Sequence, residues 1–460
     1  MTHPVRAPGA TAWRAGAVAI AAVAALAAPG MAGTAAAAVP EPPPLRVDPP
    51  AGRPPGAASG VRSPERCDPP PPAEDGPDSG AARLQLADVH RLATGRGRLI
   101  AMIDTGVYPH PLLGGRLRGG GDYITGGDGL DDCDGHGTAV AGLLAAGPDP
   151  GPTGRGSTPI GIAPGAELLS IRQSSPSFDV AGPDGTYRPA GDIESLADAI
   201  VLAVRARADV VNISEAVCLP PDRAAAEGSS LHAALGFAAE ADVVVVAAAG
   251  NIGPSCAGPG SGQVSLPGWY DDELLTVGAV EPDDTPAGFT VPGPWVDVAA
   301  PGSALRSLAV GGGTTTTGTD GTSFAAPYVA GLAALVRERF PDLTAPQVAD
   351  RILATARRPS GGENDLLGHG VIDPVAALTA VPDVLSPGAG RSVHLADLPG
   401  TAPAPPPPST PWPVDLAAVA ALLAAGSLAT WLLRRNPAAP DPAPRGGPPR
   451  PGSPRPGSPG

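Results

Sequence analysis

Short apolar segments alternate with helical patterns through the centre of the chain, and this alternation restricts the possible folds more than any other feature. Segments with the length and apolar content of buried strands lie at 99–103, 168–171, 210–213, 243–248 and 274–280. Segments with apolar residues at three- and four-residue steps lie at 193–205, 230–240, 323–340 and, after a Thr344 cap, 345–355. Alternating strands and helices predict a three-layer α/β fold with a parallel central sheet.

Proline is concentrated towards the two ends of the chain, where no such alternation occurs. Segments of this composition bury too little apolar surface to offset their ordering entropy, so we predict tails and linkers there. The predicted organisation is a signal peptide at 1–38, a proline-rich extension at 39–85, one folded domain at 86–385, a proline-rich linker at 386–413, a transmembrane helix at 414–433 and a tail at 434–460.

The first 38 residues have the pattern of an export signal. Arg6 and Arg14 accompany the start of an apolar stretch at 15–28, and small residues at 32–38 offer A-x-A cleavage sites. A permanent membrane anchor is the alternative, but the stretch is short, alanine-rich and followed by a proline and a glycine. We therefore expect a cleaved signal peptide.

The segment 414–433 is a 20-residue apolar stretch, long enough to cross a hydrocarbon core of about 30 Å. Trp412 and Trp431 mark the two interfaces, and Arg434 and Arg435 follow directly. Because arginines that flank a membrane helix stay in the cytoplasm, the chain before residue 414 is predicted outside it and the tail inside. A buried core helix is the alternative, but no folded domain follows that could bury it.

Four cysteines, whose positions allow three disulfide pairings, are present in the chain. None has the C-x-x-C spacing of a metal site, and an exported protein favours disulfides over free thiols. The four are Cys67, Cys133, Cys218 and Cys256.

Three polar residues with candidate catalytic chemistry follow one another in the order Asp104, His136, Ser323. Acyl transfer needs a nucleophile, a base that takes its proton and a carboxylate that orients the base. Asp104 ends a predicted strand, and His136 and Ser323 each open a predicted helix, which places them where active sites gather in such sheets. Each motif alone is explained by a turn or a cap, and only the combination predicts a catalytic triad.

Asn251, in the sequence Ala-Ala-Gly-Asn after the 243–248 strand, is the candidate for a second oxyanion donor through its side-chain amide. A first donor is expected at the helix start of Ser323, where free N–H groups favour developing negative charge. A Gly-Asn pair by itself would indicate only a turn.

The net charge of −15 argues against nucleic-acid binding, which needs clustered cations. Four aspartates beside His136 form an acidic cluster whose spacing matches no EF-hand loop. A solvated face that helps to orient the His136 loop is favoured over a calcium site, and we expect no metal ion or other cofactor. The cluster consists of Asp128, Asp131, Asp132 and Asp134.

With these motifs the chain resembles a subtilase over about 300 residues, in a subtilisin-like order of catalytic residues. More narrowly it resembles the mycosins, membrane-anchored proteases associated with type VII secretion systems. The narrower resemblance rests on the segments 104–111 (DTGVYPHP), 212–218 (NISEAVC), 251–256 (NIGPSC) and 321–331 (GTSFAAPYVAG), and on Cys133 three residues before His136.

The resemblance implies a serine endopeptidase that hydrolyses peptide or protein substrates outside the cell membrane. It also implies a single membrane anchor, membrane components of a type VII secretion complex as partners, and the disulfides Cys67–Cys133 and Cys218–Cys256. By the same resemblance Glu215 borders the substrate cleft, where general subtilases have an apolar residue. A narrow specificity is expected, although the preferred side chain cannot be derived from the sequence.

The proline-rich extension has 14 prolines in 47 residues and no alternation of strands and helices. It is therefore expected to be a strap over the folded domain, and not a compact inhibitory propeptide. Two hypotheses for the whole chain stay open, an active endopeptidase of narrow specificity and a structural subunit of the secretion complex for which catalysis is secondary. A degradative secreted protease is disfavoured by the predicted anchor.

Overall fold

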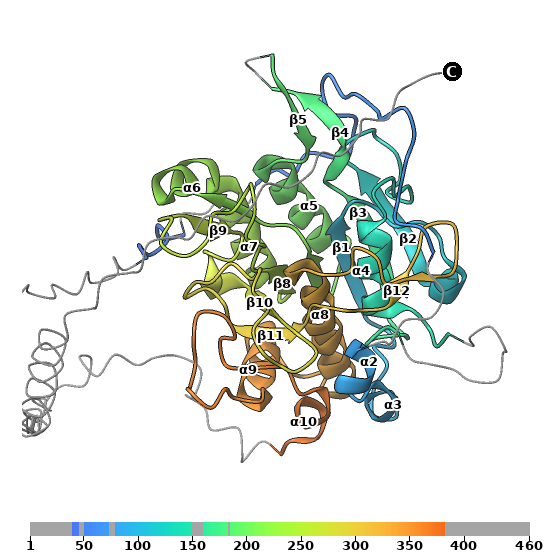
Figure 1. Cartoon of the computed structure of the whole chain (residues 1–460), viewed down its shortest axis with the longest axis vertical. Coiled ribbons are helices and arrows are strands. Elements are labelled where there is room, and N and C mark those ends of the chain that lie inside the picture. The colour runs from blue at the N-terminus through green and yellow to red at the C-terminus, as the bar shows by residue number, and fades with distance from the viewer. Residues whose placement is uncertain (1–38, 46–49, 73–78, 150–159, 183–184, 382–460) are drawn as a thin grey trace, which may run out of the picture. The chain divides into compact units, whose positions relative to one another are not determined.

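The computed structural model describes residues 39–45, 50–72, 79–149, 160–182 and 185–381 (Figure 1). The predicted signal peptide, linker, transmembrane helix and tail (1–38, 386–413, 414–433 and 434–460) lie outside these ranges. None of the helices within the described ranges is both long and apolar enough to cross a membrane.

Seven parallel strands form the central sheet of the described residues, in the order β11-β10-β8-β6-β1-β3-β2. The five predicted strands are all members and are therefore confirmed. The two others escaped prediction because β2 is glycine-rich and half-exposed, and β11 has only four residues. The strands are β1 (Leu99–Asp104), β2 (Leu117–Asp122), β3 (Glu167–Arg172), β6 (Val210–Ile213), β8 (Val244–Ala248), β10 (Leu275–Val280) and β11 (Val298–Pro301).

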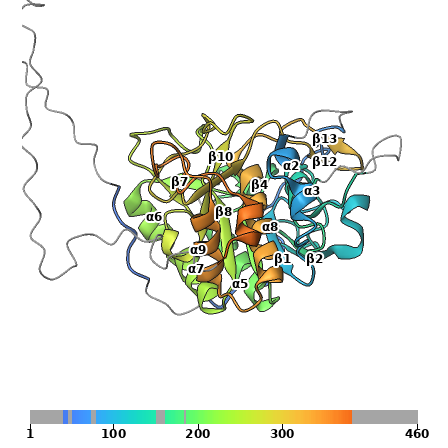
Figure 2. The same cartoon turned by 90° about the horizontal axis from the view of Figure 1, so that it is seen from below.

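Helices cover both faces of this sheet, as Figures 1 and 2 show. Successive residues of β1 point to opposite faces: Ile100 and Met102 belong to one apolar core, and Ala101 and Ile103 belong to the other. The first core also contains residues of α2 (Ser79–Arg83), α3 (Leu86–Val89), α4 (His136–Ala145), α8 (Thr322–Arg339), α9 (Ala345–Thr355) and α10 (Pro374–Thr379). The second contains residues of α5 (Ile193–Arg205), α6 (Pro221–Glu227) and α7 (Ser229–Glu240).

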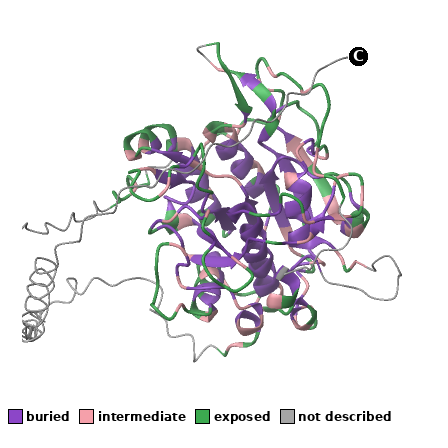
Figure 3. Ribbon diagram, viewed as in Figure 1, coloured by how far each residue is buried: buried purple, intermediate pink, exposed green. Residues whose placement is uncertain are grey.

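The four predicted helices are confirmed, with ends within one residue of the prediction. Helix α5 is amphipathic and begins with a capping box at Asp192, whereas α8 is buried along nearly its whole length (Figure 3). Helix α9 begins with a capping box between Thr344 and Gln347, as the predicted Thr344 cap requires. The three-layer α/β fold with a parallel central sheet is confirmed.

Antiparallel pairs of short strands lie outside the central sheet. Their sequences lack the apolar runs of the central strands, so they were not predicted. The pairs are β4 (Ser175–Ala181) with β5 (Tyr187–Ala190), β7 (Val217–Leu219) with β9 (Val264–Leu266), and β12 (Ser307–Leu308) with β13 (Thr314–Thr315).

The described part of the extension before α2, residues 39–45 and 50–72, is called the strap segment below. Trp269 Nε1 donates a 2.9 Å hydrogen bond to the carbonyl oxygen of Pro40 at its start. Further along, Arg53 forms an ion pair with Asp198 on α5, at 2.6 Å, and Arg62 forms an isolated bridge with Asp179 on β4. The strap segment thus contacts elements that are far apart in the sequence.

Both disulfides that the family resemblance implies are present. Cys67 of the strap segment is bonded to Cys133, close to the start of α4. Cys218 of β7 is bonded to Cys256, and there are no free cysteines among the described residues. The first disulfide attaches the strap segment next to His136.

Candidate active site

Asp104 is the last residue of β1, so its carboxylate lies at the carboxyl edge of the sheet. The side chain is fully buried, and the backbone N–H of Thr105 donates a 2.7 Å hydrogen bond to Asp104 Oδ1. His136 opens α4, and its Nδ1 lies 2.7 Å from the same oxygen. Because an ionised carboxylate only accepts hydrogen bonds, the neutral ring carries its proton on Nδ1 and leaves Nε2 as the acceptor.

Ser323 is the second residue of α8 and is buried. Its Oγ lies 2.9 Å from Nε2 of His136, within reach of a hydrogen bond that the hydroxyl donates. The ring of Phe324 packs against the imidazole with 4.9 Å between ring centroids. The structure therefore brings Asp104, His136 and Ser323 into one continuous chain of two hydrogen bonds.

Two glycines allow these segments to approach so closely. A Cβ at Gly137 would lie 2.0 Å from the carbonyl oxygen of Gly106, so a larger residue would push α4 away from the end of β1. A Cβ at Gly321 would lie 3.0 Å from Asn251 Nδ2 and 3.2 Å from Ser323 Oγ. The glycines of both motifs therefore serve the geometry of the site.

Asn251 lies three residues beyond β8, beside the start of α8. Its Oδ1 accepts hydrogen bonds from the backbone N–H of Thr322 at 3.0 Å and from the Thr322 hydroxyl at 3.1 Å. These two bonds engage the amide oxygen and direct the amide nitrogen towards Ser323. Asn251 Nδ2 and Ser323 Oγ both lie beside Gly321, where a Cβ would be 3.0 Å from the first atom and 3.2 Å from the second. This is the orientation that an oxyanion donor requires.

The acidic cluster beside His136 is only partly solvated. Asp128 and Asp131 are exposed as predicted, but the solvated-face interpretation is wrong for Asp132, which is buried. Its carboxylate accepts hydrogen bonds from Thr105 Oγ1, from the backbone of residue 135 and from both the backbone and hydroxyl of Thr138, at 2.6–2.9 Å. A donor-rich loop stabilises this buried charge, and in turn Asp132 holds the loop of His136 in place.

Asp134 also supports this loop. It accepts hydrogen bonds from the hydroxyl of Ser175 and, at 3.0 Å, from the backbone N–H of Ser177. The sequence predicted that the cluster helps to orient the His136 loop, but not that a buried Asp132 does so, because all four aspartates look alike in the sequence. The feature of the sequence that could have singled out Asp132 is its position four residues before His136.

Electrostatics at the site are dominated by carboxylates. Burial of the ring opposes protonation of His136, but the negative charge of Asp104, with smaller contributions from Glu215 and Asp132, outweighs it and raises the His136 pKa. Burial, together with the charge of Asp104, raises the pKa of Glu215. Burial likewise raises the pKa of Asp132, although its hydrogen bonds from Thr138 oppose the change.

One group of described side chains has the composition of a metal site. Asp104, His136 and Glu215 each offer one ligand atom, and these atoms all lie within 4.8 Å of one another. A cation bound there would engage the imidazole that proton transfer requires. The group is therefore unsuited to a catalytic metal.

Two pockets lie near these residues. A small one, of about 60 Å³, lies beside His136 and Phe324 and is walled by Pro70 of the strap segment and by residues of the 308–318 loop. A wider one, of about 720 Å³, is lined mainly by apolar groups around Ile252 and Leu366 and contains none of the three triad candidates. Of the three triad candidates, His136 alone lines the smaller pocket.

Residues 95–370 match the subtilase family of peptidases, Peptidase S8. Mycosin-4 of Mycobacterium tuberculosis is 44% identical over 332 residues, which cover 67% of this chain and 71% of the relative. The fold and the order of the catalytic motifs are those that this similarity would require.

Solved structures also show similarity to mycosins. The chain is similar to the MycP3 protease from the type VII (ESX-3) secretion system, with 40% identity and a TM-score of 0.64 over 75% of this chain and all of that one. A chain of an intact ESX-5 inner membrane complex is 34% identical, with a TM-score of 0.66 over 86% of this chain and 98% of that one.

Proposed function

Because the chain belongs to the subtilase family and within it to the mycosins, we propose that Asp104, His136 and Ser323 are its catalytic triad. The enzyme is a subtilisin-like serine peptidase, and the proposal assigns its chemistry to these residues. The observation that carries it is the chain of two hydrogen bonds, 2.7 Å and 2.9 Å, that joins the three side chains.

In the proposed mechanism Ser323 Oγ attacks the scissile carbonyl carbon while His136 Nε2 takes the hydroxyl proton. Asp104 holds the Nδ1 proton and stabilises the imidazolium that forms. The tetrahedral oxyanion accepts hydrogen bonds from Asn251 Nδ2 and from the backbone N–H of Ser323, which lies in the first helical turn and has no intrahelical acceptor.

Collapse of this intermediate breaks the C–N bond, and His136 returns its proton to the leaving amine. A water molecule then attacks the acyl-enzyme ester with His136 again as base, which releases the carboxylic acid and restores the serine hydroxyl. In each step the proton moves to or from Nε2 of His136.

The assignment is tested with a fluorophosphonate probe, which labels an activated serine covalently. We expect labelling and peptide hydrolysis in the wild-type enzyme, and loss of both in Ser323→Ala with an unchanged circular dichroism spectrum. The control is Ser261→Ala, at an exposed serine, which should be labelled normally. Labelling of the Ser323→Ala enzyme would refute the assigned nucleophile.

We further infer the location of the enzyme. The peptidase domain (86–385) lies outside the cytoplasm after export by the 1–38 signal, tethered through 386–413 to a single membrane helix at 414–433, with 434–460 in the cytoplasm. Support comes from the apolar stretches and arginine flanks of the sequence and from the similarity to a chain of the ESX-5 inner membrane complex.

Protease protection tests this topology. A C-terminal epitope tag should survive protease treatment of intact spheroplasts and be digested after lysis, whereas an epitope placed at 183–184 should be accessible in both. Digestion of the C-terminal tag in intact spheroplasts would contradict the proposed orientation.

Membrane components of a type VII secretion complex are the proposed partners, because similar chains are described in an ESX-5 inner membrane complex. A strain with Ser323→Ala is compared with a full deletion. If secretion fails only in the deletion strain, a structural contribution to the complex is separable from proteolysis. Failure to co-purify with any membrane component after crosslinking would contradict the partner assignment.

A further inference from the structure

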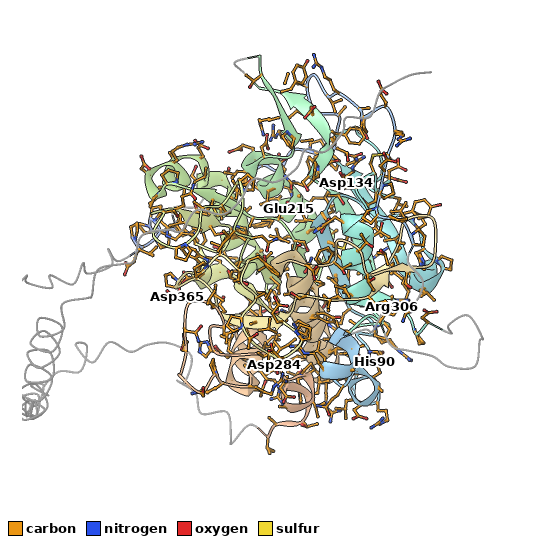
Figure 4. The ribbon with its side chains drawn as sticks, viewed as in Figure 1. His90, Asp134, Glu215, Asp284, Arg306 and Asp365 are labelled. Carbon is orange, nitrogen blue, oxygen red and sulfur yellow. A yellow bond between two sulfur atoms is a disulfide. The ribbon has the colours of Figure 1, made fainter. Side chains whose placement is uncertain are left out.

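A glutamate side chain lies beside the catalytic imidazole and is not used by the mechanism above. Glu215 follows β6, which pairs with β1 so that Ile213 is opposite Ile103, the residue before Asp104. One carboxylate oxygen of Glu215, one of Asp104 and one ring nitrogen of His136 all lie within 4.8 Å of one another. Glu215 is therefore at the reacting centre and not merely near it. Figure 4 marks the position of Glu215, in the same part of the molecule as Asp134.

The hydrogen bonds of Glu215 leave most of its acceptor capacity open. Ser174, which is buried, donates its hydroxyl to Glu215 Oε1 at 2.5 Å. A carboxylate has about four lone-pair sites, so a single donor satisfies only a fraction of them. The side chain is half-buried, so part of it remains accessible to solvent.

Negative charge gathers at this point: burial and the charge of Asp104 raise the Glu215 pKa, although the charge of the His136 imidazole lowers it. Asp104 is fully buried, and its second oxygen, Oδ2, has no hydrogen-bond partner among the described residues. Asp134 adds a further negative charge to the surroundings of Glu215. Among the described arginines none forms an ion pair with Glu215, and buried Arg172 lies 3.5 Å from Asp122 instead.

We propose that Glu215 is a specificity-determining residue that binds a basic side chain of the substrate, lysine or arginine, close to the scissile bond. The substrate backbone must pass within bonding distance of Ser323 Oγ, which is itself 2.9 Å from the imidazole. A residue next to the scissile bond can then extend an ammonium or guanidinium group to Glu215. Such a group forms a charge-assisted hydrogen bond with the open carboxylate oxygens.

A purely structural role for Glu215 is less consistent with these contacts. A residue that only braced the Ser174 segment would need one acceptor and no charge, and a glutamine would serve equally. The partial exposure of a carboxylate at a site already crowded with negative charge is instead explained by a cationic ligand, whose arrival relieves the repulsion. The inference rests on the proposed function, since it needs the substrate to bind at Ser323.

The test is a positional-scanning peptide library that varies the three residues on each side of the scissile bond, with kcat/KM measured for each substituent at low ionic strength. We expect lysine or arginine to be preferred over isosteric neutral residues, methionine and glutamine, by about tenfold at one position. In Glu215→Gln this ratio should fall to about one, and in Glu215→Arg aspartate or glutamate should become preferred at the same position.

Two further variants separate the possible outcomes. Asp134→Asn removes a nearby charge outside the proposed contact, so it should change the ratio by less than about twofold. If Asp134→Asn and Glu215→Gln lower the preference for basic residues equally, that preference arises from a diffuse electrostatic field. This result would overturn the proposed contact with Glu215. A basic preference that persists unchanged in Glu215→Gln would also overturn it.

Failure of the proposed function gives a different result. If the library is cleaved as fast by Ser323→Ala as by the wild-type enzyme, the triad assignment fails, whatever the preference for basic residues. If the wild-type enzyme cleaves the library and Ser323→Ala does not, but no position favours a basic residue, proteolysis stands and the role of Glu215 is refuted.

Discussion

The central sheet and the strap segment are held in place by different kinds of interaction. Strands β1, β6 and β8 are buried on both faces, with apolar side chains in two cores and a hydrogen-bonded ladder on either side. The strap segment is mostly exposed and is attached at separate points, by one disulfide, isolated bridges and single polar contacts such as Arg53 with Asp198.

This difference suggests a different contribution from each region: the sheet positions the residues of the site, and the strap segment adds stability. The sheet fixes the positions of catalytic groups because its strand ends are set by many cooperative contacts. The strap segment depends on a few local attachments, but one of them, Cys67–Cys133, is close to His136, and Pro69 and Pro70 lie near Gly135. Damage to the sheet edge should therefore act on the rate of catalysis, and damage to the strap segment should act first on stability.

The largest effect is expected at the sheet edge, for Asp104→Asn. The amide can donate to Nδ1 of His136 and so favours the tautomer with its proton on Nε2, which cannot accept from Ser323. We expect kcat to fall about 10⁴-fold, as in other serine proteases, with a small change in the free energy of unfolding. Steady-state kinetics and thermal unfolding measure both, and a loss below tenfold would contradict the role of Asp104.

Removal of the strap disulfide tests the other region. Cys67→Ser combined with Cys133→Ser opens a loop with a sequence separation of 66 residues, which should lower the free energy of unfolding by about 4 kcal/mol in the chain-entropy model. The double variant Cys218→Ser with Cys256→Ser, separation 38, is the control and should lose a similar amount. Denaturant unfolding of both gives the values.

Activity of the folded strap variant then sharpens the comparison. If kcat/KM per folded molecule stays within about threefold of the wild-type value, the strap segment acts on stability alone. A loss as large as that of Asp104→Asn would show that the strap segment also positions His136, and the separation of functions would be wrong.

The oxyanion donor should give the next largest effect. Asn251→Leu removes the amide and keeps the approximate volume, so kcat should fall about 10²–10³-fold with little change in KM, the size known for the corresponding donor of subtilisin. Thr322 loses its acceptor in this variant, so folding is checked by calorimetry. A change in KM with kcat unaltered would place Asn251 in substrate binding instead.

The pH profile tests how the carboxylates act on the base. Negative charge from Asp104 and Glu215 raises the pKa of His136, and only the neutral imidazole can accept a proton. Glu215→Gln removes one of these charges, so the His136 pKa should fall and the acidic limb of kcat/KM should move to lower pH, by less than about one pH unit. Movement to higher pH would contradict the sign of this interaction.

The smallest effect is expected for Arg53→Ala in the strap segment. Arg53 is mostly exposed, so its ion pair and backbone contact with Asp198 should contribute about 0.5–1 kcal/mol to stability after screening by solvent. The measurement is denaturant unfolding at low and high salt. A loss above about 2 kcal/mol would show that the strap segment is more cooperative with the sheet than its contacts suggest.

Much of the site was predictable because its motifs combine local and chain-order information. Local patterns place Asp104 at the end of an apolar strand and Ser323 at the start of a long apolar helix. Each residue can therefore be assigned to an element from its neighbours in the sequence. Strand β2 was not predictable, because its glycines have no periodicity and its pairing with β3 is a tertiary contact. The inward orientation of Asp132 was hidden for the same reason, since its four donors come from three separate residues that only folding assembles.

By itself the sequence determined the strand–helix alternation, the order of the catalytic motifs and the family, because periodicity and motif spacing are local properties of the chain. Only the tertiary structure decided that Asp132 is buried, that β2 joins the central sheet and that Glu215 lies within 4.8 Å of the His136 imidazole. These features depend on distances between segments that are far apart in the chain, and such distances are set by the packing of the whole domain.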